Sequence, residues 1–385
     1  MGKTIIGYDA KRIVRNGTGL GNYGRTLIND LAAVVPGDWQ LRLYAPDAGR
    51  EALRSQVAVS EQVQFAYPQH RPLKIQRSLW RVSSIVNDLK HDGVKLYHGL
   101  TGELPKGIRT AGIRSVVTIH DLIFLRHPEY YNRLDVKIYE WKFQTACREA
   151  DRIIAISERT KQDIMELGGV SEDRIDVIYQ SCSPRFQTAV TQQQQDEVRR
   201  CYGLPQRFVL SVGSIEERKN IRLAVRALRH LPEDVHLVAV GRQTDYSQNV
   251  LKEAADDGLG QRVHFLRNVS DADLQVLYQL AEVFVYPSRY EGFGIPIIEA
   301  IHSGLPVAAA TGSCLEEAGG PDCLYVSPDD AEALAASIGK MLKGATGREQ
   351  RIQRNRDYVR RFEGNDVAGQ VLGVYQRLLT PTPKI

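Results

Sequence analysis

Short apolar runs alternate with longer segments of helical periodicity along most of the chain, and this alternation occurs in two series. The runs are rich in β-branched residues and uninterrupted, which is typical of parallel strands buried on both faces. Strand, helix and strand in succession form the βαβ unit of a doubly wound sheet. The expected strands are 4–8, 41–44, 96–97, 116–119 and 153–156 in the first series, and 208–212, 236–240, 263–265, 283–286 and 307–309 in the second. The sequence therefore predicts an α/β protein with two doubly wound domains.

The 385 residues suffice for two domains, each with its own core. We expect an N-terminal domain over residues 1–185 and a C-terminal domain over residues 207–365. The segment 186–206 is polar and contains four consecutive glutamines, so we predict it to be the linker. Apolar residues at helical spacing in 366–380 predict a last helix that packs back on the N-terminal domain. Doubly wound domains bind ligands at the carboxyl ends of their strands, so two domains facing each other would enclose a central cleft.

Composition excludes several classes of protein. The apolar content of 43% and charged content of 25% are those of an ordinary globular protein, and a net charge of +4 is too small to indicate a nucleic-acid partner. The five cysteines are scattered without a CxxC pair, which favours reduced, mostly buried thiols over a disulfide framework. No apolar stretch reaches the roughly 18 residues of a membrane span, and the N-terminus lacks a signal-peptide core. We therefore expect a cytoplasmic protein.

The segment Glu291-Gly-Phe-Gly-Ile-Pro-Ile-Ile-Glu299 is the most informative motif. It follows an expected strand, and Pro296 is favoured at the first position of a helix. The free backbone N–H groups at such a helix start point towards a ligand. Glu291 and Glu299 can flank the same pocket, where carboxylates accept hydrogen bonds from sugar hydroxyls. An acidic first turn that complements the helix dipole is the alternative.

A second motif, Val-Gly213-Ser-Ile-Glu-Glu-Arg218-Lys219-Asn, follows the expected strand 208–212. A glycine turn followed by two cations suits a diphosphate, because it combines backbone amides with positive charge. A basic pair on an ordinary loop is the alternative. His120, directly after the strand 116–119, is expected at the same kind of sheet edge.

Three glycines, Gly19, Gly21 and Gly24, fit the dinucleotide-binding pattern G-x-G-x-x-G. The preceding strand 4–8 ends about ten residues too early for that pattern, and no acidic residue closes a second strand at the expected distance. We interpret the segment as a glycine loop ahead of a helix, and a nicotinamide-dependent oxidoreductase is the alternative. His98 is interpreted as a structural histidine.

Four cations, Arg71, Lys74, Arg77 and Arg81, fall at spacings of three and four and share one face of an expected helix, with Trp80 beside them. Such a helix can lie in a membrane interface or bind an anionic substrate. We expect peripheral contact with the inner face of the cytoplasmic membrane as one interpretation and a solvated surface helix as the other.

Asp271-Ala-Asp273 has the form of a metal-binding pair. Ser270 before it is suited to cap a helix, and aspartates in a first turn complement the helix dipole. We assign no metal.

Together these segments resemble family 4 glycosyltransferases of the GT-B fold, over nearly the whole chain. The resemblance rests on the N-terminal glycines, on Val-Val-Thr-Ile-His120-Asp, on the segments around Gly213 and Glu291, and on Ser303-Gly-Leu-Pro-Val. It implies two Rossmann-like domains facing a central cleft. It also implies a retaining, metal-independent transfer of a hexose, with mannose favoured, from a nucleotide-diphosphate sugar to a saccharide or lipid-linked acceptor in surface polysaccharide synthesis. No cofactor and no nucleic acid are implied.

The resemblance also implies roles for individual residues. Arg218 and Lys219 would hold the diphosphate, Glu299 the ribose, and Glu291 the hydroxyls of the donor sugar, with His120 beside that sugar. The other donor-binding positions that it implies are Gly19, Gly21, Gly213, Ser214, Phe293, Gly294, Ile295 and Leu315.

Two departures from the family pattern bear on these roles. Ser214 stands where many members have an arginine, so phosphate binding would depend more on Arg218 and Lys219. In Cys314-Leu315-Glu316-Glu317, Leu315 precedes the first glutamate, where the family often has proline. A non-catalytic membrane-docking scaffold and a sugar-nucleotide epimerase of the same fold are further alternatives.

Overall fold

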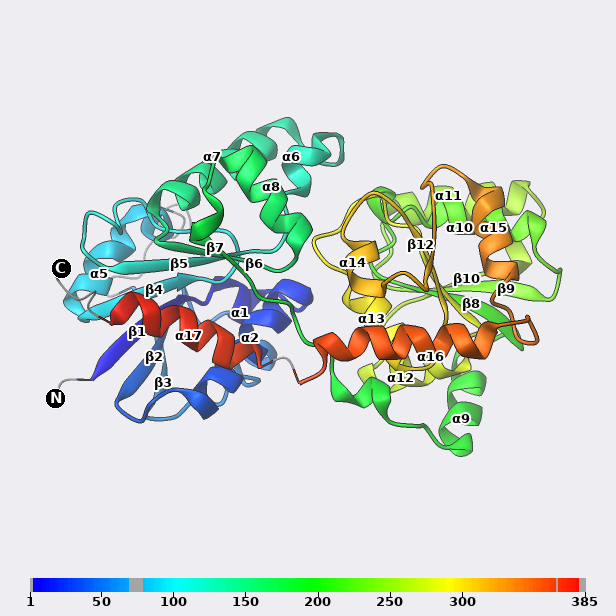
Figure 1. Ribbon diagram of the computed structural model, residues 1–385, viewed down its shortest axis with the longest axis horizontal. Helices are drawn as coiled ribbons and strands as arrows, with labels where there is room; N and C mark the ends of the chain where they lie inside the picture. The colour runs from blue at the N-terminus through cyan, green and yellow to red at the C-terminus, as the bar shows by residue number, and fades with distance from the viewer. Residues whose placement is uncertain (1–2, 69–78, 365, 381–385) are drawn as a thin grey trace. The chain divides into compact units, whose positions relative to one another are not determined.

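A computed structural model describes residues 3–68, 79–364 and 366–380 (Figure 1). The chain forms two compact units, unit 1 with Met1–Tyr179 and Asp366–Ile385, and unit 2 with Gln180–Asn365. The boundary after Tyr179 lies earlier than the sequence predicts. Most of the expected linker 186–206 belongs to unit 2, where α9 (Gln192–Tyr202) packs against α12 (Asp271–Leu280). The four glutamines that we interpreted as part of the linker instead begin this helix. Thr191 and Gln194 form a capping box at its start.

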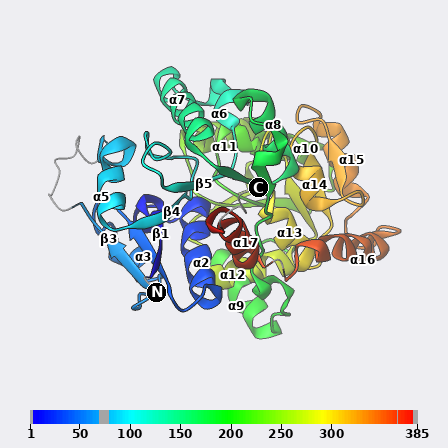
Figure 2. The same ribbon diagram turned by 60° about the vertical axis from the view of Figure 1, so that its left-hand side comes forward.

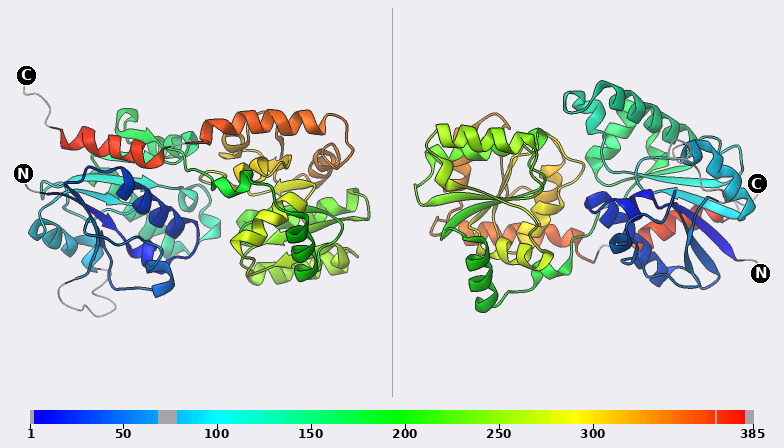
Figure 3. Two further views of the ribbon diagram at one scale, coloured as in Figure 1. Left: turned by 90° about the horizontal axis from the view of Figure 1, so that it is seen from below. Right: turned by 180° about the vertical axis from the view of Figure 1, so that it is seen from behind.

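Unit 1 contains a parallel sheet of seven strands in the order β3-β2-β1-β4-β5-β6-β7, with helices on both faces (Figure 3). The order reverses between β1 and β4, and such a switch point is where doubly wound sheets bind ligands. The strands are β1 Thr4–Asp9, β2 Trp39–Tyr44, β3 Val63–Ala66, β4 Val94–Gly99, β5 Arg114–Ile119, β6 Arg152–Ala155 and β7 Ile175–Val177. The principal helices are α1 Lys11–Arg15, α2 Gly19–Val34, α5 Ile85–His91, α6 Ile123–Arg126, α7 Arg133–Glu149, α8 Glu158–Gly168 and α17 Val367–Leu379.

The last helix of the chain, α17, packs against α2 of unit 1 (Figure 2). Its Tyr375 is fully buried, and its hydroxyl lies 2.6 Å from Nδ1 of His98. The other ring nitrogen of His98 lies 2.8 Å from the hydroxyl of Thr118, and burial lowers the pKa of His98 to about 3. His98 is therefore a neutral structural residue, which confirms its interpretation from sequence.

Unit 2 contains a parallel sheet of six strands in the order β10-β9-β8-β11-β12-β13, so its order reverses between β8 and β11. The strands are β8 Arg207–Val212, β9 Val235–Val240, β10 Val263–Leu266, β11 Val283–Tyr286, β12 Val307–Ala310 and β13 Leu324–Val326. The principal helices besides α9 and α12 are α10 Ile221–Ala227, α11 Asp245–Asp256, α13 Ile295–His302, α14 Leu315–Gly319, α15 Ala331–Gly339 and α16 Arg348–Val359. The two predicted doubly wound α/β domains are confirmed, and β3, β7 and β13 are strands that the sequence did not predict.

The basic helix differs from its prediction. Arg71, Lys74 and Arg77 lie outside the described residues. The expected contact of Trp80 and Arg81 with a membrane or an anionic substrate is wrong, because both side chains point inward. Trp80 is 7% exposed and its indole N–H donates to Asp88 at 2.6 Å, while the Arg81 side chain is 10% exposed and forms ion pairs with two carboxylates.

Two general properties follow from the described part of the chain. None of its helices has the length and apolar character needed to cross a membrane. Its five cysteines are free thiols, of which Cys147, Cys314 and Cys323 are buried and Cys201 is exposed.

Candidate active site

The two motifs expected to bind a donor lie next to each other in unit 2. β8 leads into residues 213–220, and its neighbour β11 leads into residues 287–294. Because the strand order reverses between β8 and β11, the connections leave in opposite directions and open a space at the carboxyl edge. A small cavity there is lined by Gly213, Ser214 and Lys219 from the first connection and by Tyr286 from the end of β11.

An ion cluster centred on Glu291 joins the two connections. Its Oε1 lies 2.5 Å from Nζ of Lys219, and its Oε2 lies 3.1 Å from the guanidinium of Arg218. Lys219 also donates to the hydroxyl of Tyr286 at 2.9 Å, and Arg218 donates to the carbonyl of Tyr290 at 2.7 Å. The Glu291 side chain is 11% exposed, so one nearly buried carboxylate faces two fixed cations.

The cluster keeps its members ionised. Burial raises the pKa of Glu291, but the charges of Lys219 and Arg218 lower it further, to about 2. Burial lowers the pKa of Lys219, and the charge of Glu291 outweighs this effect, so the pKa is raised above its usual value. Cations that are fixed in a buried site interact strongly with an incoming phosphate, because little water screens them.

Glu299 lies in a different environment, on α13 behind the glycine segment. Its Oε2 accepts a hydrogen bond of 2.8 Å from the hydroxyl of Tyr278 on α12. Burial raises the pKa of Glu299, and the bond from Tyr278 opposes the change. The two glutamates of the motif are thus distinct, Glu291 held by cations and Glu299 held by a neutral donor. A carboxylate of the second kind has lone pairs left for ligand hydroxyls.

Backbone conformation fixes the shape of the first connection. Gly213 has φ 147°, a region that favours glycine. Asn220 has φ 55°, which asparagine tolerates better than most residues. Its side-chain amide donates to the carbonyl oxygens of Pro287 at 3.2 Å and Pro328 at 2.8 Å. Asn220 therefore ties the connections after β8, β11 and β13 together.

The second connection is held against α14. Gly294 precedes α13, and a Cβ there would lie 2.8 Å from Cβ of Ala318. The thiol of Cys314 donates to the carbonyl oxygens of Glu291 at 3.1 Å and Phe293 at 2.6 Å. Ile295 and Leu315 are the first residues of α13 and α14. The backbone amides at both helix starts therefore lie beside the ion cluster's loop.

His120 of unit 1 follows β5, as the sequence predicts. Its Nε2 lies 2.9 Å from the carbonyl oxygen of Leu100, which can only accept, so Nε2 carries the proton. Burial lowers the pKa of His120 to about 4, and the ring is neutral at pH 7. The edge of the ring meets Tyr23 of α2, with the centroids 4.7 Å apart.

The N-terminal glycines are not a loop, contrary to the prediction. Gly19 is the first residue of α2, and α1 separates it from β1. A Cβ on Gly21 would lie 1.8 Å from the carbonyl oxygen of Asn16, and one on Gly24 would lie 2.9 Å from Ile13, whereas one on Gly19 would meet no atom within 4 Å. The nicotinamide alternative loses its basis, because the strand-to-helix turn that binds a pyrophosphate is absent from this segment.

The pair Asp271 and Asp273 lies in the first turn of α12, as predicted. The Ser270 hydroxyl accepts from the Asp273 N–H at 3.1 Å, and the carboxylate of Asp271 pairs with Arg185 at 2.9 Å. Within residues 3–68, 79–364 and 366–380, no group of three His, Cys, Asp or Glu side chains is placed to hold a metal ion.

Sequence reasoning missed a second ion cluster, at the switch point of unit 1. Arg81 lies 2.5 Å from a carboxylate oxygen of Asp9 at the end of β1 and 2.9 Å from one of Glu103, which also pairs with Lys142 at 3.1 Å. Asp9 carried a usable signal, a charged residue ending a buried strand. Tyr278, Tyr286 and Asn220 were missed as well, and of these only Tyr286, at the end of β11, could have been found by that rule.

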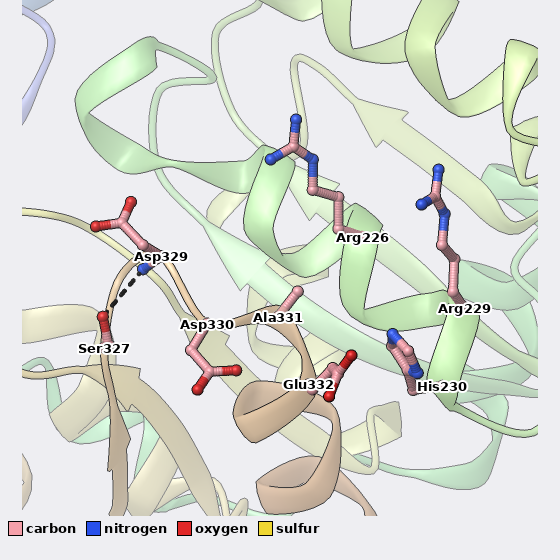
Figure 4. Close-up of a pocket in the computed structure, with 8 residues that line it drawn as sticks. All are labelled: Arg226, Arg229, His230, Ser327, Asp329, Asp330, Ala331 and Glu332. Atoms are coloured by element: carbon pink, nitrogen blue, oxygen red, sulfur yellow. Dashed lines mark hydrogen bonds between the residues drawn. The ribbon is translucent and has the colours of Figure 1, made fainter.

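Another hollow of unit 2 lies elsewhere, with a volume of about 500 Å³. Figure 4 shows its arginines on one side and its acidic residues on the other. Asp329 already pairs with Arg289, Arg229 pairs with Asp257, and Asp330 caps α15. The hollow contains neither of the two motifs, so we do not regard it as the active site.

Comparison with known proteins agrees with this geometry. Residues 17–186 match the family model described as Glycosyltransferase Family 4, and residues 194–358 match the model described as Glycosyl transferases group 1. The chain is a glycosyltransferase that consists of these two family regions.

Relatives of this glycosyltransferase include two mannosyltransferases. O-antigen chain mannosyltransferase B of Escherichia coli is 29% identical over 287 residues, 74% of each chain. O-antigen chain mannosyltransferase RfbU of Salmonella typhimurium is 27% identical over 256 residues, 66% of this chain and 67% of its own. Sucrose-phosphate synthase of Thermosynechococcus elongatus has a TM-score of 0.77 at 21% identity, covering 98% of this chain and 99% of that one. The GT-B fold implied by the resemblance is confirmed.

The expected site residues of the glycosyltransferase are divided between the two models. Gly19, Gly21 and His120 fall in the family 4 region, and the motifs around Gly213 and Glu291 fall in the group 1 region. The contacts described above give these residues their positions, while their individual roles stay predictions.

Proposed function

We propose that this glycosyltransferase transfers a hexose, with mannose favoured, from a nucleotide-diphosphate sugar to a saccharide or lipid-linked acceptor, with retention and without a metal. The observation that carries the proposal is the buried cluster of Glu291, Arg218 and Lys219. Glu299 lies at the other end of the motif that begins with Glu291. Two cations supply the charge that a departing diphosphate needs, and the glutamates supply acceptors for sugar and ribose hydroxyls.

The relatives support the choice of hexose and of pathway class. Both relatives described above are named O-antigen chain mannosyltransferases, and both align over about two thirds or more of their length. We therefore favour mannose as the sugar and surface polysaccharide as the product. Free, mostly buried thiols fit a reducing compartment, so we place the reaction in the cytoplasm.

The bond between the anomeric carbon and the diphosphate oxygen breaks, and the acceptor oxygen forms the new bond to that carbon. Negative charge grows on the departing diphosphate, and Arg218 and Lys219 stabilise it because they are already in place. The acceptor proton passes to the departing phosphate. A phosphate that binds Arg218 and Lys219 competes with Glu291 for these two cations. Donor binding therefore frees the carboxylate of Glu291 to accept hydrogen bonds from the hydroxyls of the donor sugar.

The first test identifies the nucleotide. GDP, UDP and ADP are compared for their effect on the melting temperature, because a ligand that binds the native state stabilises it by mass action. We expect one nucleotide to raise the melting temperature and Glu299→Ala to remove most of the increase. The control is Glu332→Ala, an exposed glutamate of the hollow in Figure 4, which should keep the increase.

The second test follows the product. NMR of the anomeric centre after reaction with a mannosyl donor should show the donor configuration, and chelation with EDTA should leave the rate unchanged. Inversion would contradict the stereochemical proposal, and loss of activity on chelation would contradict metal independence. Incubation without acceptor should leave the sugar unaltered, and an epimerised nucleotide sugar would favour the epimerase instead.

A further inference from the structure

Lys219, one of the two cations of the ion cluster in unit 2, has a neutral partner besides Glu291. Its Nζ donates a hydrogen bond of 2.9 Å to the hydroxyl of Tyr286. The same Nζ lies 5.1 Å from the centroid of the tyrosine ring, within the range of a cation–π contact. Tyr286 is 3% exposed. One buried side chain therefore offers the ammonium both a hydroxyl and an aromatic ring.

The hydroxyl of Tyr286 has a fixed position in unit 2. Tyr286 is the last residue of β11, and its ring stacks on that of Phe284, with the centroids 5.7 Å apart and the planes at 22°. Phe284 in turn contacts Tyr278, with the centroids 5.5 Å apart, and both of these residues are fully buried. Close packing of this kind leaves a ring little freedom to move. The strand and a buried row of rings therefore set the place of the hydroxyl.

The side chain of Lys219, in contrast, depends on its partners for its position, because a lysine has a flexible four-carbon stem. It lies across the turn at Gly213, where an added Cβ would be 3.6 Å from Cε and 3.7 Å from Nζ of the lysine. Glu291 and Tyr286 take two of the three N–H groups of the ammonium. No other residue in the described part of the chain accepts the third, which is therefore available to a phosphate.

The two partners of Lys219 respond differently to a phosphate. Glu291 is an anion, so a phosphate competes with it for the ammonium. Tyr286 is neutral, because burial and the charge of Glu291 raise the pKa of its hydroxyl to about 12. A neutral acceptor does not repel a phosphate, so the hydrogen bond between Lys219 and Tyr286 is kept when the carboxylate is displaced.

We propose that Tyr286 is a positioning residue for Lys219, and that it holds the ammonium in place for the donor diphosphate once Glu291 has been displaced. Because the proposed function assigns this diphosphate to Arg218 and Lys219, the inference rests on that function. Tyr286 acts through the lysine and does not itself contact the donor. A lysine that is already held loses less side-chain freedom when it binds the diphosphate, so the hydroxyl increases the affinity of the site.

The test measures the affinity of the full-length protein for nucleoside diphosphates by isothermal titration calorimetry. GDP, UDP and ADP are titrated, and the one that binds most tightly is used throughout. Tyr286→Phe removes the hydroxyl and keeps the ring, and it should weaken binding by about tenfold, because a hydrogen bond from a charged group is lost. Tyr202→Phe is the matched control, since it removes a hydroxyl bond of the same 2.9 Å length to the carboxylate of Asp273. It should bind like the wild type.

Double-mutant cycles separate positioning of Lys219 from a general structural role of Tyr286. In a Lys219→Ala background, Tyr286→Phe should change the affinity by less than about twofold, because no ammonium is left to position. In a Glu291→Gln background, the tenfold loss should be kept, because the hydroxyl acts on the lysine independently of the carboxylate. Urea titration checks that each variant is folded.

Three results would overturn the role of Tyr286 while leaving the proposed function intact. The first is binding by Tyr286→Phe within about twofold of the wild type. The second is the same loss with and without Lys219, which would make the effect structural. The third is no loss in the Glu291→Gln background, which would mean that Tyr286 acts through the carboxylate. Normal nucleotide binding by Lys219→Ala alone would instead contradict the proposed function.

Discussion

Each of the two sheets carries an ion cluster at its switch point, and the two clusters have opposite arrangements. In unit 1 one guanidinium, that of Arg81, lies between two carboxylates. In unit 2 one carboxylate, that of Glu291, lies between Arg218 and Lys219. One cation is therefore shared by two acids at the first point, whereas one acid is shared by two cations at the second. With Lys142 beside Glu103 and Glu216 beside Arg218, each cluster contains two cations and two acids.

The difference indicates separate tasks for two similar frameworks. An anion approaching Arg81 meets two carboxylates first, which disfavours binding. An anion approaching Lys219 has to displace the carboxylate of Glu291, which Lys219 and Arg218 share. We infer that the cluster of unit 1 stabilises the fold and that the cluster of unit 2 binds the donor.

The largest expected effect comes from Lys219→Ala. Turnover of nucleotide sugar should fall by about 100- to 1,000-fold, because one of the two charges that stabilise the departing diphosphate is lost. Steady-state kinetics measure the effect, and Lys252→Ala, at an exposed position of α11, is the matched control. Activity within twofold of the wild type would remove the distinction between the clusters.

Arg81→Met should affect stability instead of binding. The free energy of unfolding should fall by about 3–5 kcal/mol, because the buried carboxylate of Asp9 loses its paired cation, while Glu103 keeps Lys142. Urea titration measures this, and nucleotide affinity should stay the same. In the control Arg15→Ala, where the paired side chain is 47% exposed, the loss should be under about 1 kcal/mol. The inference about unit 1 fails if Arg81→Met loses nucleotide binding while its stability is unchanged.

Acid should weaken both clusters in the same range of pH. Glu291 and Glu103 are buried, which raises the pKa of each, but the neighbouring cations lower both values from 4.5 to about 2. Because the folded pKa lies below the unfolded one, the stabilisation is complete above about pH 4.5 and is lost as the pH falls towards 2. Unfolding free energies measured across this range should depend less on pH in Glu291→Gln and in Glu103→Gln. A wild-type slope in both variants would contradict the assignment.

The smallest effect is expected for Tyr278→Phe. Loss of the hydroxyl that donates to Glu299 should weaken nucleotide binding by about fivefold, equivalent to about 1 kcal/mol, through poorer positioning of that carboxylate. Isothermal titration calorimetry measures the change. Tyr202→Phe, which removes a bond of 2.9 Å to Asp273, is the control and should bind nucleotide normally. Equal losses in both variants would mean that Tyr278 has no particular relation to the site.

Central strands of both sheets could be predicted from the sequence because they are buried on both faces and read as apolar runs. The missed strands β3, β7 and β13 lie at sheet edges, have four, three and three residues, and are only partly buried. Such short edge strands have no distinctive pattern. The polar segment 186–206 was mistaken for a linker because its helix α9 has a mostly exposed, hydrophilic surface.

The donor site could be predicted because each of its motifs is continuous in sequence and follows a strand. The residues that position it could not, since Tyr278 reaches Glu299 from another helix. The cluster of unit 1 was invisible for the same reason, because Asp9, Arg81 and Glu103 come together only through the order of strands. Trp80 was misread because an amphipathic pattern does not say which side of a helix the protein covers.

The return of the chain to unit 1 has a consequence for its synthesis. Tyr375 and the rest of α17 complete the core beneath His98, yet they leave the ribosome only after the whole of unit 2. Until unit 2 has been translated, the sheet of unit 1 therefore lacks α17, and the apolar groove that α17 fills stays uncovered. Messages truncated within α17 should yield polypeptides that chaperones retain and proteases remove, even though every residue of the donor motifs is present.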